Sequence, residues 1–177
     1  RISGLNGADR DIVRTLAAAA EDLPPPGHAG EAFGAFFARY GDASLVLLGE
    51  ATHGTSEFYR ARAAISRFLI RNHGFNIVAV EADWPDAARI DRYVRHHTPE
   101  PSREQAFARF PSWMWRNQEV LEFASWLRDE NQQRPDTARV EFRGLDIYSL
   151  RASMAAVLAY LDRVDPEEAE LARRRYA

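Results

Sequence analysis

Between Ser44 and Thr55 the sequence reads SLVLLGEATHGT, and a helical pattern begins directly after it at Ser56. The first five residues are typical of a strand, and the glycines that follow suit a tight turn. Glu50 and His53 stand in that turn, three residues apart, where the free N–H groups of the next helix begin. A strand that turns directly into a helix indicates an α/β fold. The polar pair at the junction makes this turn the first candidate for a functional site.

The alternation of helical and strand-like patterns continues through the rest of the chain. Helices are predicted over residues 8–20, 31–40, 56–72, 85–96, 103–110, 117–131, 149–162 and 166–176, and strands over 44–48, 76–81 and 139–146. Strands separated by helical crossovers predict a mostly parallel sheet with helices on both of its faces. The unbroken apolar run at 76–81 predicts a strand covered on both faces, and the alternation at 139–146 predicts a more exposed one.

Composition bounds the chemistry that the chain can carry. Its 177 residues include no cysteine and no lysine, so all 23 basic side chains are arginine. Thiol nucleophiles, thiolate metal sites and Schiff-base mechanisms are therefore excluded. The net charge of −3 does not predict nucleic-acid binding, and no apolar run is long enough to span a membrane. No signal peptide is evident, so we expect a cytoplasmic protein, although the first residue is Arg1 and an upstream segment is conceivable.

Acidic and imidazole side chains follow each predicted strand at the point where it ends. The first strand leads to Glu50 and His53, the second to Glu81 and Asp83, and the third to Asp146. The carboxyl ends of parallel strands meet at one edge of a sheet, and ligands bind there. A single carboxylate after a strand is more often a helix cap or loop residue. The coincidence of three strands favours a site at this edge.

Several familiar kinds of site are missing from this junction. There is no GxSxG nucleophile elbow, no GxxxxGK[ST] phosphate loop and no dinucleotide fingerprint. Two possibilities remain open from the residues alone. One is a histidine that acts as general base on water, and the other is a metal site built from His53 with Glu50, Glu81 and Asp146.

Three segments together resemble the erythromycin esterase family. They are GEATHGTSEFYRAR at 49–62, VAVEADW at 78–84 and FRGLDIYS at 142–149. The resemblance implies an active-site core of Glu50, His53, Arg62 and Glu81. It also implies that the chain is the N-terminal portion of a longer protein, whose other half contributes a further histidine. We accordingly expect an N-terminal helical segment at 1–43, an α/β core at 44–150 and C-terminal helices at 151–177 that lead toward that half.

The resemblance and the residues suggest one mechanism. His53 is expected to activate a water that attacks an ester or lactone carbonyl, with Glu50 and Glu81 orienting the imidazole and the water. Arg62, nine residues beyond His53, is expected to reach back and stabilise the oxyanion. No cofactor is required by this mechanism, although a divalent metal is possible. The alternative is a metal- or haem-binding protein, or a metal-dependent hydrolase, on a related scaffold.

Five further residues are candidates for substrate binding. Asp83 and Asp146 belong to the strand edge, Trp84 follows the second strand, and Trp113 and Trp115 lie in an aromatic stretch between two predicted helices. Large aromatic side chains can wall an apolar pocket for a bulky substrate such as a macrolide ring, although ordinary core packing is their commoner role. The expected ligand is a small-molecule ester or lactone, and the sequence says nothing of oligomeric state.

Overall fold

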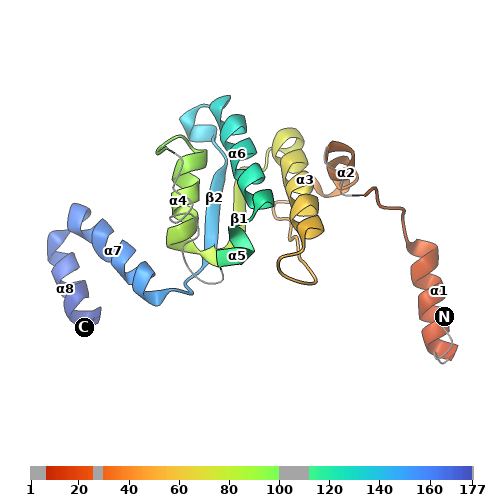
Figure 1. The fold of residues 1–177 in the computed structure, drawn as a ribbon, viewed down its shortest axis with the longest axis horizontal. Coiled ribbons are helices and arrows are strands. Elements are labelled where there is room, and N and C mark those ends of the chain that lie inside the picture. The colour runs from red at the N-terminus through yellow and green to blue at the C-terminus, as the bar shows by residue number, and fades with distance from the viewer. Residues whose placement is uncertain (1–6, 26–29, 100–111, 177) are drawn as a thin grey trace.

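The fold is an α/β arrangement of helices around a small parallel sheet (Figure 1). The computed structural model describes residues 7–25, 30–99 and 112–176. Strand β1 (Ile77–Asp83) pairs in parallel with β2 (Glu141–Asp146), with Ile77 opposite Glu141 and Val80 opposite Gly144. The register shifts between Val80 and Asp83, so the pairing is irregular toward the carboxyl end of β1. The predicted fold class is confirmed for this sheet.

Helices account for most of the remaining described residues. They are α1 (Gly7–Ala19), α2 (Glu31–Ala35), α3 (Ser56–His73), α4 (Trp84–Val94), α5 (Ser112–Trp115), α6 (Gln118–Gln132), α7 (Leu150–Val164) and α8 (Pro166–Tyr176), with 3-10 turns at Ala38–Tyr40 and Asp136–Ala138. The helix predicted over 103–110 lies outside the described residues. No described helix combines the length and the apolar composition needed to cross a bilayer.

Local signals set the ends of the two helices nearest the predicted site. Helix α3 starts after Thr55 and stops at Gly74, whose φ of 73° is the left-handed conformation that glycine adopts at helix ends. Helix α6 starts after Asn117, whose side chain accepts a hydrogen bond of 2.9 Å from Val120 N. Both boundaries agree with the sequence to within one residue.

Two apolar clusters hold the described core together. The larger joins α3, α4 and α6 to both strands, and its fully enclosed members include Val94, Leu127, Val140 and Phe142. In Figure 1 the strands lie between α4 on one side and α3 on the other. The smaller cluster packs Phe33 of α2 against α3. Burial of side chains such as Leu127 stabilises this arrangement by about 2 kcal/mol each.

The segment 44–48, predicted as the first strand, forms no ladder with any described strand. That prediction is wrong for the structure, and the reason is spatial. A cavity of about 820 Å³ separates this segment from β1. Val46 and Leu48 pack against the smaller apolar cluster, whereas Leu45 and Leu47 are 73% and 84% exposed. The backbone follows the helix α3 that it precedes, without reaching the sheet.

The predicted burial of the second strand is also wrong. Strand β1 was expected to be covered on both faces, yet Ile77 is 55% exposed and Ala79 and Glu81 are exposed as well. The alternation predicted for the third strand is present: Val140 and Phe142 are buried, whereas Arg143 and Leu145, at 74%, are exposed. Both strands border the cavity, β1 from Ile77 to Glu81 and β2 at Phe142 and Leu145, and α4 packs mainly against β2.

Candidate functional site

Glu50 is the centre of a small cluster of charged groups in the turn before α3. One of its carboxylate oxygens is hydrogen-bonded to Nδ1 of His53, and the other lies 2.8 Å from Nη2 of Arg62. The Glu50 side chain is only 11% exposed and Arg62 only 22%, so this ion pair is largely screened from water. Nδ1 must be the donor, because an ionised carboxylate can only accept. The turn therefore sets the tautomer of His53.

The second carboxylate oxygen of Glu50 is buried and lacks a hydrogen bond of good geometry. Its contact with Arg62 is close but does not have the geometry of a hydrogen bond. We treat the contact as a charge pair, because a 2.8 Å separation at low exposure is strongly attractive whatever its angle.

The backbone of the turn explains how Glu50, His53 and Arg62 meet. Gly54 has a φ of 78°, a conformation that favours glycine, and it turns the chain sharply into α3. A hydroxyl contact of 2.6 Å between Thr52 and Thr55 closes the turn. Arg62, two helical turns into α3, then folds back over the turn that precedes the helix. The sequence run and the geometry agree on these three residues.

Tyr59 lies beneath Arg62 and was not singled out from the sequence. The guanidinium carbon sits 4.9 Å from the centre of the Tyr59 ring, and the hydroxyl donates to the Met114 carbonyl at 2.5 Å. Burial raises the pKa of Tyr59 above its ordinary value, against a smaller opposing effect of a backbone hydrogen bond with Gly54. The hydroxyl is thus a neutral donor. The spacing of three residues between Tyr59 and Arg62 on one helix was the available signal.

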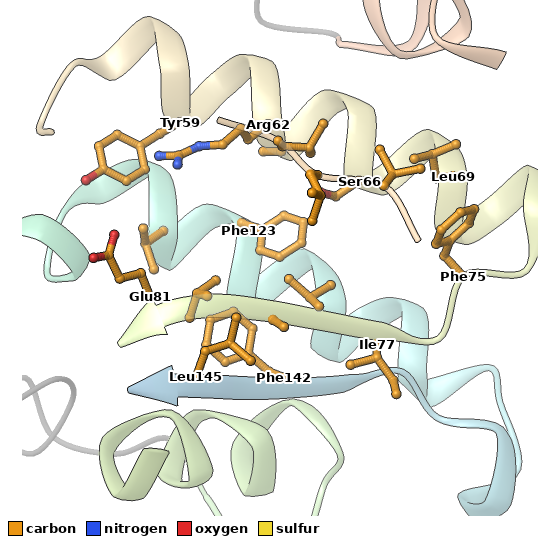
Figure 2. A pocket seen from close by; sticks show the side chains of 18 of the residues that line it. Tyr59, Arg62, Ser66, Leu69, Phe75, Ile77, Glu81, Phe123, Phe142 and Leu145 are labelled. Carbon is orange, nitrogen blue, oxygen red and sulfur yellow. The ribbon is translucent and has the colours of Figure 1, made fainter. Parts of the chain in front are cut away.

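Glu81 faces the same cavity from the other side. Figure 2 shows its side chain at the end of β1, with Tyr59 and Arg62 above it on α3. The backbone carbonyl of Glu81 accepts a 3.0 Å hydrogen bond from the indole N–H of Trp115. All four residues of the predicted core, Glu50, His53, Arg62 and Glu81, therefore line one cavity, as does Trp115.

The rest of the cavity wall is mainly apolar. It comes from the segment 44–48, α3, β1, β2, α5 and α6, and includes Leu48, Leu69, Phe75, Val80 and Phe123. Glu119 is one of the few other acidic groups on it, and the sequence analysis did not select it. A hydrogen bond from Ser56 holds the pKa of Glu119 below its ordinary value, with a smaller effect of Arg60 at 3.8 Å. Glu119 is therefore charged near neutral pH.

Four residues predicted to bind substrate are absent from this wall. Asp83 is buried and accepts hydrogen bonds of 2.8 and 3.1 Å from Ser149 N, just before α7. Asp146 accepts a hydrogen bond from the backbone N–H next to it, and Trp84 begins α4. Trp113 is 53% exposed and packs beside Gly54. The carboxylates of Asp83 and Asp146 are thus used in bonds to backbone N–H groups.

The described residues do not assemble a metal site. No three histidine, aspartate or glutamate side chains within the described ranges are placed to hold an ion together. Glu50 is instead engaged by His53 and Arg62.

Known proteins with similar sequences are hydrolases and esterases by name. "Putative hydrolase YbfO" of Bacillus subtilis (strain 168) is 25% identical over 128 residues, which is 72% of this chain and 27% of that protein. "Erythromycin esterase type II" of Escherichia coli is 27% identical over 107 residues, 60% of this chain and 24% of that protein. The chain thus spans about a quarter of the length of these curated relatives.

Solved structures share the fold, and a family model matches much of the chain. A succinoglycan biosynthesis protein superposes with a TM-score of 0.71 at 24% identity, over 94% of this chain and 42% of that one. A Bacillus cereus protein gives 0.66 at 25% identity, over 89% and 38%. The model of the erythromycin esterase family matches residues 70–177, which include Glu81. Because that match covers more than half of the sequence, the chain belongs to the erythromycin esterase family.

Proposed function

We propose that the protein hydrolyses a carboxylic ester or lactone, with His53 as the general base that activates water. The observation that carries the proposal is the Glu50 carboxylate, which engages both His53 Nδ1 and Arg62 at the mouth of an apolar cavity. One group thereby orients a base and a cation toward the same space. Membership of the erythromycin esterase family supports a hydrolase.

The proton chemistry follows from the tautomer of His53. With Nδ1 donating to Glu50, the neutral ring carries its free lone pair on Nε2. Within the described ranges Nε2 has no hydrogen-bond partner, and the side chain is 48% exposed, so water can reach it. Nε2 takes a proton as the water oxygen attacks the carbonyl carbon. It returns that proton to the leaving alkoxide when the tetrahedral intermediate collapses, and Glu50 stabilises the imidazolium between the two steps.

Arg62 supplies positive charge where the carbonyl oxygen becomes negative. Its guanidinium is held in place by Glu50 and by the Tyr59 ring, so little reorganisation is needed when the oxyanion forms. A group of this kind contributes about 3 kcal/mol to transition-state stabilisation. Glu81 lines the opposite side of the cavity, and in this proposal it orients the attacking water.

The cavity wall favours a bulky, largely apolar acyl or lactone group. Aliphatic and aromatic side chains from helices, strands and the segment 44–48 surround a space of about 820 Å³, large enough for a drug-sized molecule. A macrolide lactone is one member of that class, and a role in antibiotic resistance follows only if it is the substrate. A cytoplasmic location and a second active-site histidine outside this chain remain predictions.

The test is hydrolysis of a neutral aryl ester by His53→Ala and Glu50→Gln variants. We expect kcat to fall by about 10²- to 10⁴-fold for His53→Ala and by at least about tenfold for Glu50→Gln. Two matched controls should keep the wild-type rate: Glu57→Gln, which removes the same charge from the exposed first turn of α3, and His97→Ala, which removes a half-exposed imidazole elsewhere.

The same assay separates the mechanism from its metal-dependent alternative. Activity that is unchanged after dialysis against a chelator supports the His53 base. Full activity of His53→Ala would refute it. The metal-dependent mechanism would be supported instead if the protein bound one metal ion per chain, lost hydrolysis when that ion was removed, and lost metal binding in the Glu50→Gln variant.

A further inference from the structure

We propose that Tyr59 is a positioning residue that holds Arg62 over the site and, through Trp115, ties Arg62 to the strand end that carries Glu81. The role of Tyr59 in catalysis rests on the proposed function, but its structural part does not. No group on Tyr59 needs to touch the substrate. Its effect on the reaction would pass entirely through the side chains that it holds.

The first link runs from Tyr59 to Arg62 along one face of α3. The two residues are three apart, and the guanidinium carbon stands 4.9 Å from the ring centre. The ring itself is only 6% exposed, so it is a fixed surface. A guanidinium stacked on an immobile ring and paired with Glu50 at 2.8 Å is held from two directions. Without the ring, the ion pair alone leaves the long arginine side chain several rotamers.

The second link runs from Tyr59 to the segment after the undescribed residues 100–111. The Tyr59 hydroxyl donates to the Met114 carbonyl at 2.5 Å, and its ring meets the Trp115 ring edge to face, with 6.3 Å between centres and planes at 80°. The Asn117 side chain donates to the same carbonyl at 3.1 Å. Tyr59 thus fixes both the backbone and the indole of this segment against α3.

The third link reaches the sheet. The Trp115 indole N–H donates to the backbone carbonyl of Glu81 at 3.0 Å. Arg62, Tyr59, Trp115 and Glu81 consequently form a continuous series of contacts from α3 to the end of β1. Figure 2 shows Tyr59 and Arg62 on one side of the cavity and Glu81 on the other. Reacting groups on two separate elements need such a connection, since displacements near 1 Å already cost activity.

A buried tyrosine can also be an ordinary core residue, and a matched pair of variants distinguishes the two roles. Tyr59→Leu removes the ring beneath Arg62. Tyr93→Leu removes an equally buried tyrosine of α4 that carries Arg128 at 4.6 Å over its ring, away from the cavity. We expect both variants to lose similar thermal stability. Only Tyr59→Leu should lower kcat, by about tenfold with KM changed less than about twofold, because Arg62 acts on the transition state.

Two further variants test each end of the series. Tyr59→Phe keeps the ring, so kcat should stay within about threefold of wild type. Trp115→Phe keeps an aromatic ring but removes the N–H that donates to the Glu81 carbonyl, so kcat should fall by about three- to tenfold. This variant tests the link even if Tyr59→Leu does not fold. Wild-type kcat in Trp115→Phe would overturn the connection to Glu81.

The decisive measurement is a double-mutant cycle with Arg62→Gln. If Tyr59 acts largely through Arg62, Tyr59→Leu should lower kcat clearly less in the Arg62→Gln background than in wild type, and the remaining loss should not exceed that of Trp115→Phe. Losses that multiply would overturn the proposal. Should the wild-type protein hydrolyse no ester, the proposed function fails while the structural claim stays testable by NMR. Tyr59→Leu should then shift the Arg62 Nε–H and Trp115 indole N–H resonances, and Tyr93→Leu should not; unshifted resonances would overturn it.

Discussion

Replacing Asn131 by alanine should cost this fold more than any single exposed polar substitution. Asn131 is fully buried on α6, where its side-chain amide donates to the carbonyls of Val94 at 3.0 Å and Val140 at 2.9 Å. Its carbonyl oxygen accepts from Val140 N at 2.7 Å. The three bonds join the end of α4 to the residue that leads into β2. Asn131→Ala removes all three and supplies no replacement partner.

The magnitude follows from these contacts. Each lost hydrogen bond is worth about 1 kcal/mol, and the stranded backbone groups belong to Val94 and Val140, both with 0% exposure. With the penalty for leaving buried groups unsatisfied, the loss should reach about 3 to 5 kcal/mol. For a chain of this size the midpoint of thermal unfolding would then fall by about 10 °C.

Urea denaturation followed by circular dichroism measures the loss directly. The matched control is Asn72→Ala, which removes an exposed amide whose one hydrogen bond, to the Phe68 carbonyl at 3.0 Å, lies within α3. We expect the control to stay within about 0.5 kcal/mol of wild type. If Asn131→Ala cost less than about 1 kcal/mol at an unchanged urea dependence, the three bonds would not be what holds β2 to α4 and α6.

Two other predictions concern acid stability and sheet packing. Burial raises the pKa of Glu130, but hydrogen bonds from Arg71 and Arg134 outweigh it and leave the pKa below its ordinary value of 4.5. The ionised Glu130 therefore stabilises the fold above pH 4.5, and this stabilisation is lost as the pH falls through the pKa that Glu130 has in the folded protein. Glu130→Gln should therefore lose less unfolding free energy than wild type between pH 6 and pH 3, by about 1 kcal/mol in urea titrations; parallel losses would contradict this. Gly144→Ala would place its Cβ 2.5 Å from a backbone carbonyl oxygen of β1, so it should lower unfolding free energy by about 2 kcal/mol, while Gly7→Ala, with open space around it, should not; equal melting temperatures would contradict the packing.

The helices of the core were predictable because their signals are local. Gly74 ends α3 and Asn117 caps α6 through conformational and hydrogen-bonding preferences that neighbouring residues decide. The meeting of Glu50, His53 and Arg62 was also predictable, since a turn and two turns of one helix bring them together. The positions of these three side chains therefore depend on the geometry of one short segment of the chain.

The sheet was less predictable, because pairing depends on distant segments. The apolar run at 44–48 has the composition of a strand, yet it stands across a cavity from β1 and forms no ladder in the described structure. Asp83 and Asp146 have the position of site residues in the sequence, yet their carboxylates bond to backbone N–H groups near α7. A strand end can serve a site or a cap equally well until its neighbours are placed.

By itself the sequence determined the family, the main helices and the charged cluster in the turn before α3, all of which depend on residues close together in the chain. Only the tertiary structure decided which distant groups join that cluster. It brings Glu81 of β1 and Trp115 to the cavity and seats Tyr59 under Arg62 against the Met114 carbonyl. Those contacts come from the packing of α3, the segment after residue 111 and β1, which no local pattern encodes.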